Sequence, residues 1–192
     1  MHALFDEWLK LAAHLGARCV ASGQVIAGAE SCTGGLISAV LTSVSGSSAW
    51  VDRTLVTYSN SAKQELLGVT ADTLERFGAV SEETAREMAL GALRDHYAGT
   101  AANRADAAPN LSYAVTGVAG PTGGSASKPV GMVCFGFARR WGSSADASAR
   151  SVEVFTDTRY FAGDRSAVRE QSVNHVLAEL QRVIDGDWRV NR

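Results

Sequence analysis

The sequence predicts a single α/β domain in which a mixed β-sheet is flanked by α-helices. Its 192 residues are the length of one domain, and 46% hydrophobic with 20% charged residues is the composition of an ordinary globular protein. Strand-like and helix-like segments alternate in the first half of the chain, whereas strand-like segments follow one another directly in the second half. Because no internal repeat or linker divides the chain, we expect one domain over residues 1–192.

The first elements follow from the spacing of apolar residues. An amphipathic helix is predicted over residues 1–20 by the apolar positions Leu4, Trp8, Leu11, Leu15 and Cys19, which recur at intervals of three and four. Gly23 closes this helix, and the short apolar run 25–29 predicts a strand. The segment from Thr33 has the apolar spacing of a second helix, and residues 54–58 alternate as a strand does.

Helices dominate the middle of the chain. Two short ones are each expected to end at a glycine, residues 61–67 at Gly68 and residues 69–78 at Gly78. Ser81 is predicted to cap a further helix that runs to about Tyr97, because its hydroxyl can accept a free amide and two glutamates follow it. The segment 98–110 is small and polar and ends in proline, so we expect a surface loop there.

The last third of the chain predicts three strands and one long helix. The strands are expected at residues 111–116, 130–137 and 151–156, the third pairing back after a turn that begins near Trp141. Asp164 is predicted to cap a final helix that reaches Ile184. The tail 185–192 is expected to fray.

Charge and cysteine content argue against several classes of protein. Eighteen basic and twenty acidic residues give a net charge of −2, which does not suit a large nucleic-acid surface. Three cysteines without C-x-x-C spacing favour neither a disulfide framework nor a zinc site. The acidic start MHALFDEWLK is unlike a signal peptide, and no apolar run approaches the ~20 residues of a membrane span. We therefore expect a cytoplasmic protein that binds neither nucleic acid nor membrane.

The first candidate site is AESCTGG, residues 29–35, at the junction of a predicted strand and helix. Ser31 would lie at the carboxyl end of the strand, where open α/β sheets bind ligands, and the free amides of the helix could hold an oxyanion. Gly34 and Gly35 would let a ligand approach the backbone closely. The simpler alternative is that Ser31 or Thr33 only caps the helix, which is the commonest role of such residues.

Cys32 is a second candidate nucleophile in the same stretch. A thiol at a helix N-terminus has a lowered pKa, which favours the reactive thiolate. The four histidines fall on predicted helices or at the terminus, so none is placed to assist it or to complete a Ser-His-Asp triad. A small buried packing residue is therefore the favoured interpretation of Cys32.

The second candidate site is YSNSAK, residues 58–63. With no suitable histidine, a desolvated lysine can activate a serine if its pKa falls well below ~10.4, and Lys63 follows the end of a strand on the same edge as Ser31. Tyr58 could donate or relay a proton there. Asn60 stands three residues before Lys63, so the Ser-x-x-Lys motif of penicillin-binding hydrolases is absent. The alternative is a solvated lysine and a tyrosine that covers the sheet edge.

Two further stretches suit an anion. The glycine-rich segment 116–124, followed by Lys128, could cradle a phosphate with its backbone amides, although it is not a P-loop and could equally be a flexible hairpin. Arg165 and Arg169, at the start of the last predicted helix, could meet a phosphate or pair with a neighbouring carboxylate.

Seven stretches of the sequence match the motifs of one known family in the same order. They are AESCTGG (29–35), SGSSAW (45–50), VTYSNSAKQELLGV (56–69), GAVSEETAREMA (78–89), AVTGVAGPTGG (114–124), KPVGMV (128–133) and FAGDRSAVR (161–169). These stretches span nearly the whole chain, and through them the sequence resembles the CinA carboxy-terminal domain family, the nicotinamide-nucleotide amidases. Thr122, where the family often has glycine, and a longer 98–110 loop are the two departures.

The resemblance implies that the protein hydrolyses the carboxamide of nicotinamide mononucleotide to nicotinic acid mononucleotide and ammonia, without a metal or other cofactor. Ser31 matches the family's proposed nucleophile, Lys63 its proposed base and Tyr58 its proton-transfer partner. The residues expected to bind substrate are Cys32, Thr33, Gly34, Gly35, Asn60, Thr116, Gly117, Gly120, Gly123, Gly124, Lys128 and Arg165.

Partners and further activities are also expectations from this resemblance. Some relatives carry an additional amino-terminal domain with pyrophosphatase activity, whereas here Met1 leads directly into the first predicted helix, so we expect the amidase alone. We expect a small-molecule nucleotide as ligand and a symmetric homodimer. The alternative is a non-catalytic nucleotide-binding module that acts with a partner protein, because kinship of fold does not establish catalysis.

Overall fold

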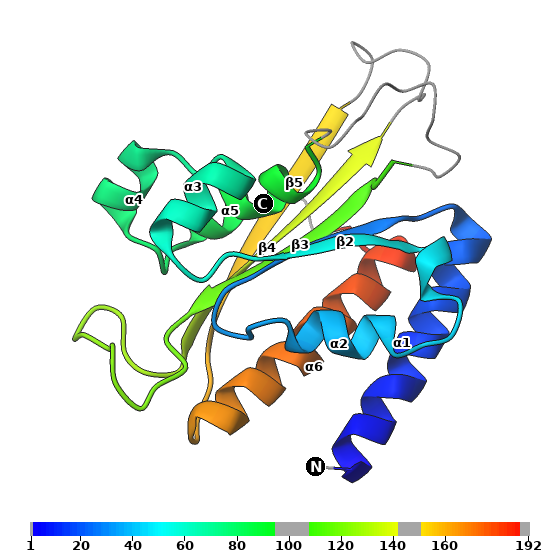
Figure 1. The fold of residues 1–192 in the computed structure, drawn as a ribbon, viewed down its shortest axis with the longest axis horizontal. Helices are drawn as coiled ribbons and strands as arrows, with labels where there is room; N and C mark the ends of the chain where they lie inside the picture. The colour runs from blue at the N-terminus through cyan, green and yellow to red at the C-terminus, as the bar shows by residue number, and fades with distance from the viewer. Residues whose placement is uncertain (1, 95–107, 142–150, 189–192) are drawn as a thin grey trace.

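The computed structural model describes residues 2–94, 108–141 and 151–188, which form three layers with a β-sheet in the middle (Figure 1). One face of the sheet is covered by α3 (Asn60–Leu67), α4 (Ala71–Phe77) and α5 (Glu82–Ala92). The other face is covered by α1 (His2–Ser22), α2 (Leu36–Thr42) and α6 (Arg165–Ile184). The expected α/β class, with a mixed sheet between helices, is confirmed.

Within the described residues, the sheet has five strands with one reversal of strand order. Its order is β2 (Val51–Val56), β1 (Ile26–Glu30), β3 (Leu111–Gly117), β4 (Met132–Trp141) and β5 (Ser151–Tyr160), and a short 3₁₀ helix, η1 (Ser47–Ala49), precedes β2. β1 pairs in parallel with both neighbours, whereas β4 is antiparallel to β3 and to β5. The chain leaves β1 for β2 on one side and later returns to β3 on the other. Ligands of open α/β sheets bind at such a switch point, outside the carboxyl ends of the strands.

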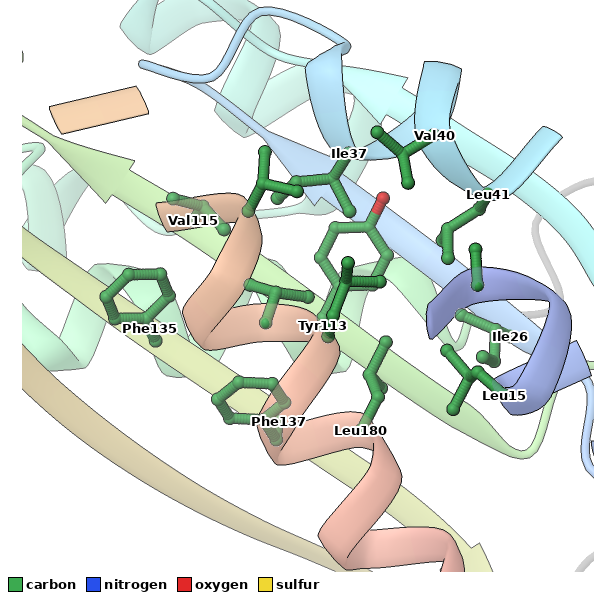
Figure 2. Packing of buried hydrophobic residues seen from close by; sticks show 14 of the residues in the cluster. Leu15, Ile26, Ile37, Val40, Leu41, Tyr113, Val115, Phe135, Phe137 and Leu180 are labelled. Carbon is green, nitrogen blue, oxygen red and sulfur yellow. The ribbon is translucent and has the colours of Figure 1, made fainter. Parts of the chain in front are cut away.

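Two apolar cores lie on the two faces of the sheet. The larger one, under α1, α2 and α6, holds the big side chains drawn in Figure 2, including Ile26, Tyr113 and Phe135. The smaller one, under α3 to α5, contains Ala27 and Ala29 of β1. Successive β1 residues thus alternate between the cores, as the pleat of a strand requires. Burial of each large apolar side chain stabilises the fold by about 1.5–3 kcal/mol.

One glycine makes room for the central aromatic ring of the larger core. A Cβ on Gly28 of β1 would lie 2.4 Å from the ring of Tyr113 on β3, so any side chain at position 28 would displace that ring. Figure 2 shows the Tyr113 hydroxyl pointing toward α2, and this orientation determines what the hydroxyl can bond. Because Gly28 has no side chain, the Tyr113 ring can lie over β1 with its hydroxyl oxygen directed at α2.

Several helix boundaries follow the predicted caps, and two do not. Ser81 and Asp164 cap α5 and α6 as expected, each accepting an amide from three residues ahead. The helix expected from Thr33 begins only at Leu36, because two glycines with left-handed backbone precede it. α5 ends at Ala92 and not near Tyr97, because the next two amides bond back three residues and tighten the last turn.

The structure also differs from the sequence expectations at the edges of the domain. Leu11, expected to face the core from α1, is 52% exposed. The tail was expected to fray from residue 185, but Trp188 packs edge-on against Phe155, with ring centroids 5.2 Å apart. Most of the expected 98–110 loop, the turn after Trp141 and residues 189–192 lie outside the described residues.

Among the helices that the structure describes, none has the length and apolar character needed to cross a bilayer.

Candidate functional site

Ser31 lies at the switch point of the sheet, directly after β1. Its amide donates to the carbonyl of Val115 on β3 at 2.9 Å, and the carbonyl of the preceding Glu30 accepts the amide of Thr57, after β2, at 2.8 Å. The backbone around Ser31 is therefore held from both neighbouring strands. The residue is 8% exposed, so its hydroxyl is mostly shielded from bulk water.

Lys63 reaches the same point from α3. Ser59 caps this helix by accepting the amide of Ala62, and the first turn places Lys63 over the carboxyl ends of β1 and β2. The Lys63 Nζ lies 3.1 Å from Ser31 Oγ and donates to the carbonyl of Thr57 at 2.7 Å. The sequence expectation that the two side chains share one edge of the sheet agrees with this geometry.

The environment of Lys63 favours its neutral form. The residue is only 1% exposed, and burial lowers the pKa of its amine from the ordinary 10.5. No carboxylate among the described residues forms an ion pair with it. A neutral amine at 3.1 Å from a hydroxyl can accept its proton, which is what a serine nucleophile needs.

The turn between β1 and α2 is shaped by two glycines and one buried carboxylate. Gly34 and Gly35 have φ values of 59° and 89°, a backbone conformation that residues other than glycine rarely adopt. Glu30, fully buried, accepts the amides of Gly35 at 2.9 Å, Ile37 at 3.3 Å and Ser38 at 2.8 Å. The expectation that these helix amides await an oxyanion is therefore wrong, since an internal carboxylate already occupies them.

Among the described residues, two amides of this turn are not bonded to any other residue. Gly34 donates to the Ser31 carbonyl at 3.0 Å and Leu36 to the Thr33 carbonyl at 3.2 Å. Within the part of the chain that the structure describes, the amides of Cys32 and Thr33 form no backbone or side-chain hydrogen bond to another residue. These two amides directly follow Ser31, so they are the ones that could face charge developing beside its Oγ.

A cavity of about 220 Å³ opens in front of this pair of side chains. It is lined by Ser31, Cys32, Tyr58, Lys63, Ala79, Val80, Thr116, Gly117, Ala119 and Arg165. Tyr58, 63% exposed, accepts a hydrogen bond from Arg165 Nη2 at 3.1 Å, while Arg165 Nη1 donates to the Gly120 carbonyl at 3.0 Å. The Arg165 guanidinium thus joins the Tyr58 side chain to the glycine-rich loop.

A second hollow adjoins the first. It has a volume of about 430 Å³ and shares Ala119 and Arg165 with the first cavity, and its other lining residues include Pro121 and Val130. Ala119 and Arg165 therefore border both hollows.

The structure brings together about half of the residues expected at the site. Ser31, Cys32, Tyr58, Lys63, Thr116, Gly117 and Arg165 line the first cavity. Outside that lining are Thr33, Gly34, Gly35, Asn60, Gly120, Gly123, Gly124 and Lys128. Lys128 Nζ donates instead to the carbonyl of Phe77, after which the chain enters the segment that supplies Ala79 and Val80.

Sequence reasoning missed other members of the site. Thr57 contributes only its carbonyl, and Ala79, Val80 and Ala119 contribute shape, so their residue types carry no chemical signal. Glu30 had a signal: an acidic residue immediately before the turn into a helix is well placed to accept helix amides.

Cys32 is unsuited to act as a thiolate. The residue is 6% exposed, and burial raises the pKa of its thiol to about 12. Desolvation therefore outweighs the residue's own backbone hydrogen bond and the positive charges of Arg165 and Lys63, which lower the pKa. The thiol stays protonated at neutral pH and packs beside the cavity.

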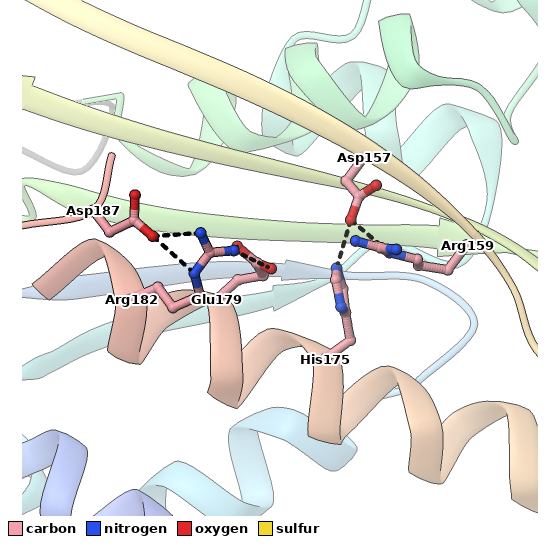
Figure 3. Close-up of polar contacts among 6 residues, drawn as sticks. All are labelled: Asp157, Arg159, His175, Glu179, Arg182 and Asp187. Atoms are coloured by element: carbon pink, nitrogen blue, oxygen red, sulfur yellow. Dashed lines mark hydrogen bonds and ion pairs between the residues drawn. The ribbon is translucent and has the colours of Figure 1, made fainter. Parts of the chain in front are cut away.

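The described residues contain one group with the composition of a metal site, and it lies three strands away from β1. Ligand atoms of Asp157, His175 and Glu179 come within 4.8 Å of one another between β5 and α6 (Figure 3). Arg159 bonds to Asp157 at 2.7 Å and Arg182 to Glu179 at 3.3 Å, so arginines neutralise both carboxylates. The cluster is a charge network that ties α6 to the edge strand, and it includes no residue of the cavity lining.

Comparison with known proteins places the chain in a family. The CinA C-terminal domain matches residues 9–184. The chain belongs to the CinA C-terminal domain family. The resemblance inferred from the sequence motifs is therefore confirmed.

Individual members of the CinA family are similar over almost the whole chain. The nicotinamide-nucleotide amidohydrolase PncC of Enterobacter agglomerans is 51% identical over 163 residues, which cover 85% of this chain and 87% of that protein. The protein of the same name from Escherichia coli K12 is 44% identical over 175 residues, 91% of this chain and 93% of the relative. The crystal structure of the competence/damage inducible protein CihA from Agrobacterium tumefaciens has a TM-score of 0.74 at 40% identity and covers 93% of this chain and 95% of CihA.

Proposed function

We propose that this CinA-family protein is a nicotinamide-nucleotide amidohydrolase, which converts nicotinamide mononucleotide and water to nicotinic acid mononucleotide and ammonia. The names of its 51% and 44% identical relatives support this activity. The observation that carries the proposed chemistry is the buried amine of Lys63 at 3.1 Å from Ser31 Oγ, inside a cavity. A hydroxyl paired with a desolvated amine is a recurrent device for attack on amide carbonyls.

The reaction divides into acylation and deacylation. In acylation, neutral Lys63 takes the Ser31 proton as Oγ bonds to the carboxamide carbon, and the carbonyl oxygen becomes an oxyanion held by the Cys32 and Thr33 amides. The carbon–nitrogen bond then breaks, and ammonia leaves with the proton returned by Lys63. In deacylation, a water molecule gives a proton to Lys63 and attacks the ester, which releases the carboxylic acid and restores the Ser31 hydroxyl.

In the proposed complex the nucleotide lies across the two hollows. The nicotinamide ring occupies the cavity beside Ser31, and the ribose phosphate extends past Arg165 into the second hollow. Arg165 is better placed for the phosphate than Lys128, because Arg165 belongs to both linings whereas Lys128 belongs to neither. Tyr58, bonded to Arg165, lies at the same mouth, where its hydroxyl serves in proton transfer or in orienting the ribose.

Release of ammonia from nicotinamide mononucleotide by the purified protein tests this proposal. Ammonia is measured by a coupled assay and the nucleotide acid by chromatography, with Ser31→Ala as the matched control. We expect equal amounts of both products from the wild type and almost none from Ser31→Ala. Binding of the nucleotide by the wild type without turnover would replace this proposal with the nucleotide-binding module.

A further inference from the structure

Glu30 is a buried carboxylate that pairs with dipoles and not with a cation. It is fully buried and accepts four hydrogen bonds, three from the amides of Gly35, Ile37 and Ser38 and one from the Tyr113 hydroxyl at 3.2 Å. No ion pair to Glu30 is present among the described residues. Burial of a carboxylate is costly unless donors surround it, so these four donors and Glu30 depend on one another.

The pleat of β1 sends Glu30 and Ser31 to opposite faces of the sheet. The Glu30 carboxylate meets α2 on one face, whereas Ser31 meets Lys63 of α3 on the other. One peptide group joins the two residues, and it is bonded to both flanking strands. The two strands therefore hold the start of the turn at Ser31, and the Glu30 carboxylate holds its other end at the amides of Gly35, Ile37 and Ser38.

Glu30 also determines which amides of the turn remain available. It occupies the amides of Gly35, Ile37 and Ser38, and the backbone occupies those of Ser31, Gly34 and Leu36. The amides left over are those of Cys32 and Thr33. We propose that Glu30 is a positioning residue: its carboxylate anchors the turn so that Ser31 Oγ stays within hydrogen-bond distance of Lys63 Nζ and these two amides face the reacting carbonyl. This inference rests on the proposed amidohydrolase function.

Glu30→Gln tests the inference with little change in volume. The glutamine side chain keeps one acceptor oxygen, but its NH₂ group faces backbone amides that are themselves donors. At least one of the hydrogen bonds that hold the turn is therefore lost. Because misplacement by about 1 Å costs on the order of 10²-fold in rate, we expect kcat to fall by about 10²-fold with KM within about threefold. The first-order acylation rate, measured with excess enzyme in a single turnover, should fall equally, and a loss of folded protein would not change that rate constant.

Glu87→Gln is the matched control for this substitution. Glu87 on α5 also accepts a backbone amide, that of Thr70 at 2.7 Å, and the Thr73 hydroxyl at 2.6 Å, but it anchors α4. It lines neither hollow. We expect its acylation rate to match the wild type even where its melting temperature falls.

A readout without nicotinamide mononucleotide separates the inference from the proposed function. The pseudo-first-order rate of Ser31 labelling by a fluorophosphonate should also fall about 10²-fold in Glu30→Gln, since the same placement of Oγ is needed. If the wild type releases no ammonia but shows this labelling difference, the proposed function fails and the positioning role stands. Folded Glu30→Gln with wild-type acylation and labelling rates would overturn the positioning role.

Tyr113→Phe tests the positioning role of Glu30 if Glu30→Gln does not fold. It removes one of the four donors and keeps the ring that packs over Gly28. We then expect labelling and acylation to slow about three- to tenfold, less than for loss of the carboxylate, because three amides still hold Glu30. Unchanged rates in Tyr113→Phe would then refute the inference.

Discussion

Replacement of Lys63 by methionine should abolish turnover while nucleotide binding survives. Methionine keeps an unbranched chain in a site that is only 1% exposed, and it removes the amine at 3.1 Å from Ser31 Oγ. General-base catalysis contributes about 10²–10⁴-fold, which corresponds to about 3–5 kcal/mol of the activation barrier. We expect kcat to fall by at least this factor.

Lys63→Arg sharpens the same test. A guanidinium stays protonated at any working pH and cannot accept the serine proton, so this variant should also be inactive although it keeps the positive charge. In the wild type, kcat should rise with pH through the lowered pKa of Lys63, because only the neutral amine acts as base. The assay is ammonia release from pH 5 to 10, with the Kd of the nucleotide measured by calorimetry. Near-normal turnover in Lys63→Arg would show that Lys63 anchors substrate by charge, and another base would be required.

Four further predictions follow from the same geometry. The folded protein binds fewer protons at Lys63 than the unfolded chain does, because burial lowers the pKa of this amine. The free energy of unfolding of the wild type, relative to Lys63→Met, should therefore rise with pH from the lowered pKa up to about 10.5. Denaturant titrations at several pH values measure this difference, and a difference that does not change with pH would contradict the prediction. Cys32→Ala should keep substantial turnover, whereas Ser31→Ala should lose nearly all of it in the same assay, and the opposite ranking would indicate a cysteine amidase. Arg165→Met should raise KM about tenfold or more, since a hydrogen bond to a charged group is worth about 1.5–3 kcal/mol, whereas Lys128→Met should leave KM within about twofold. Activity should survive exhaustive chelation, and a lasting loss that a divalent ion restores would overturn the serine mechanism.

The sequence was sufficient to predict the fold class and the meeting of Ser31 with Lys63. Apolar periodicity set the order of helices and strands, and both residues follow the carboxyl ends of predicted strands, so their approach over 32 residues of chain required only that the two strands be neighbours in the sheet. Local patterns carry this information because they reflect which face each element buries.

The details that the sequence did not predict are local backbone conformations and the directions in which long side chains point. The apolar spacing after Thr33 predicts a helix that includes Gly34 and Gly35, yet the left-handed backbone of these glycines delays α2 to Leu36. Lys128 and Arg165 were equivalent phosphate candidates, because no local pattern determines where a long side chain on a glycine-rich loop or at a helix start will point.

The measurement that tests the central claim most directly is the site of acylation during turnover. Wild-type protein is mixed with nicotinamide mononucleotide, quenched in acid within milliseconds to seconds, digested and mapped by mass spectrometry. Attack by Ser31 predicts that the nicotinate mononucleotide acyl group is found as an ester on the peptide that contains Ser31, on the hydroxyl and not on the neighbouring thiol, and that Ser31→Ala yields neither adduct nor ammonia. An acyl group on Cys32, or undiminished ammonia release by Ser31→Ala, would contradict it.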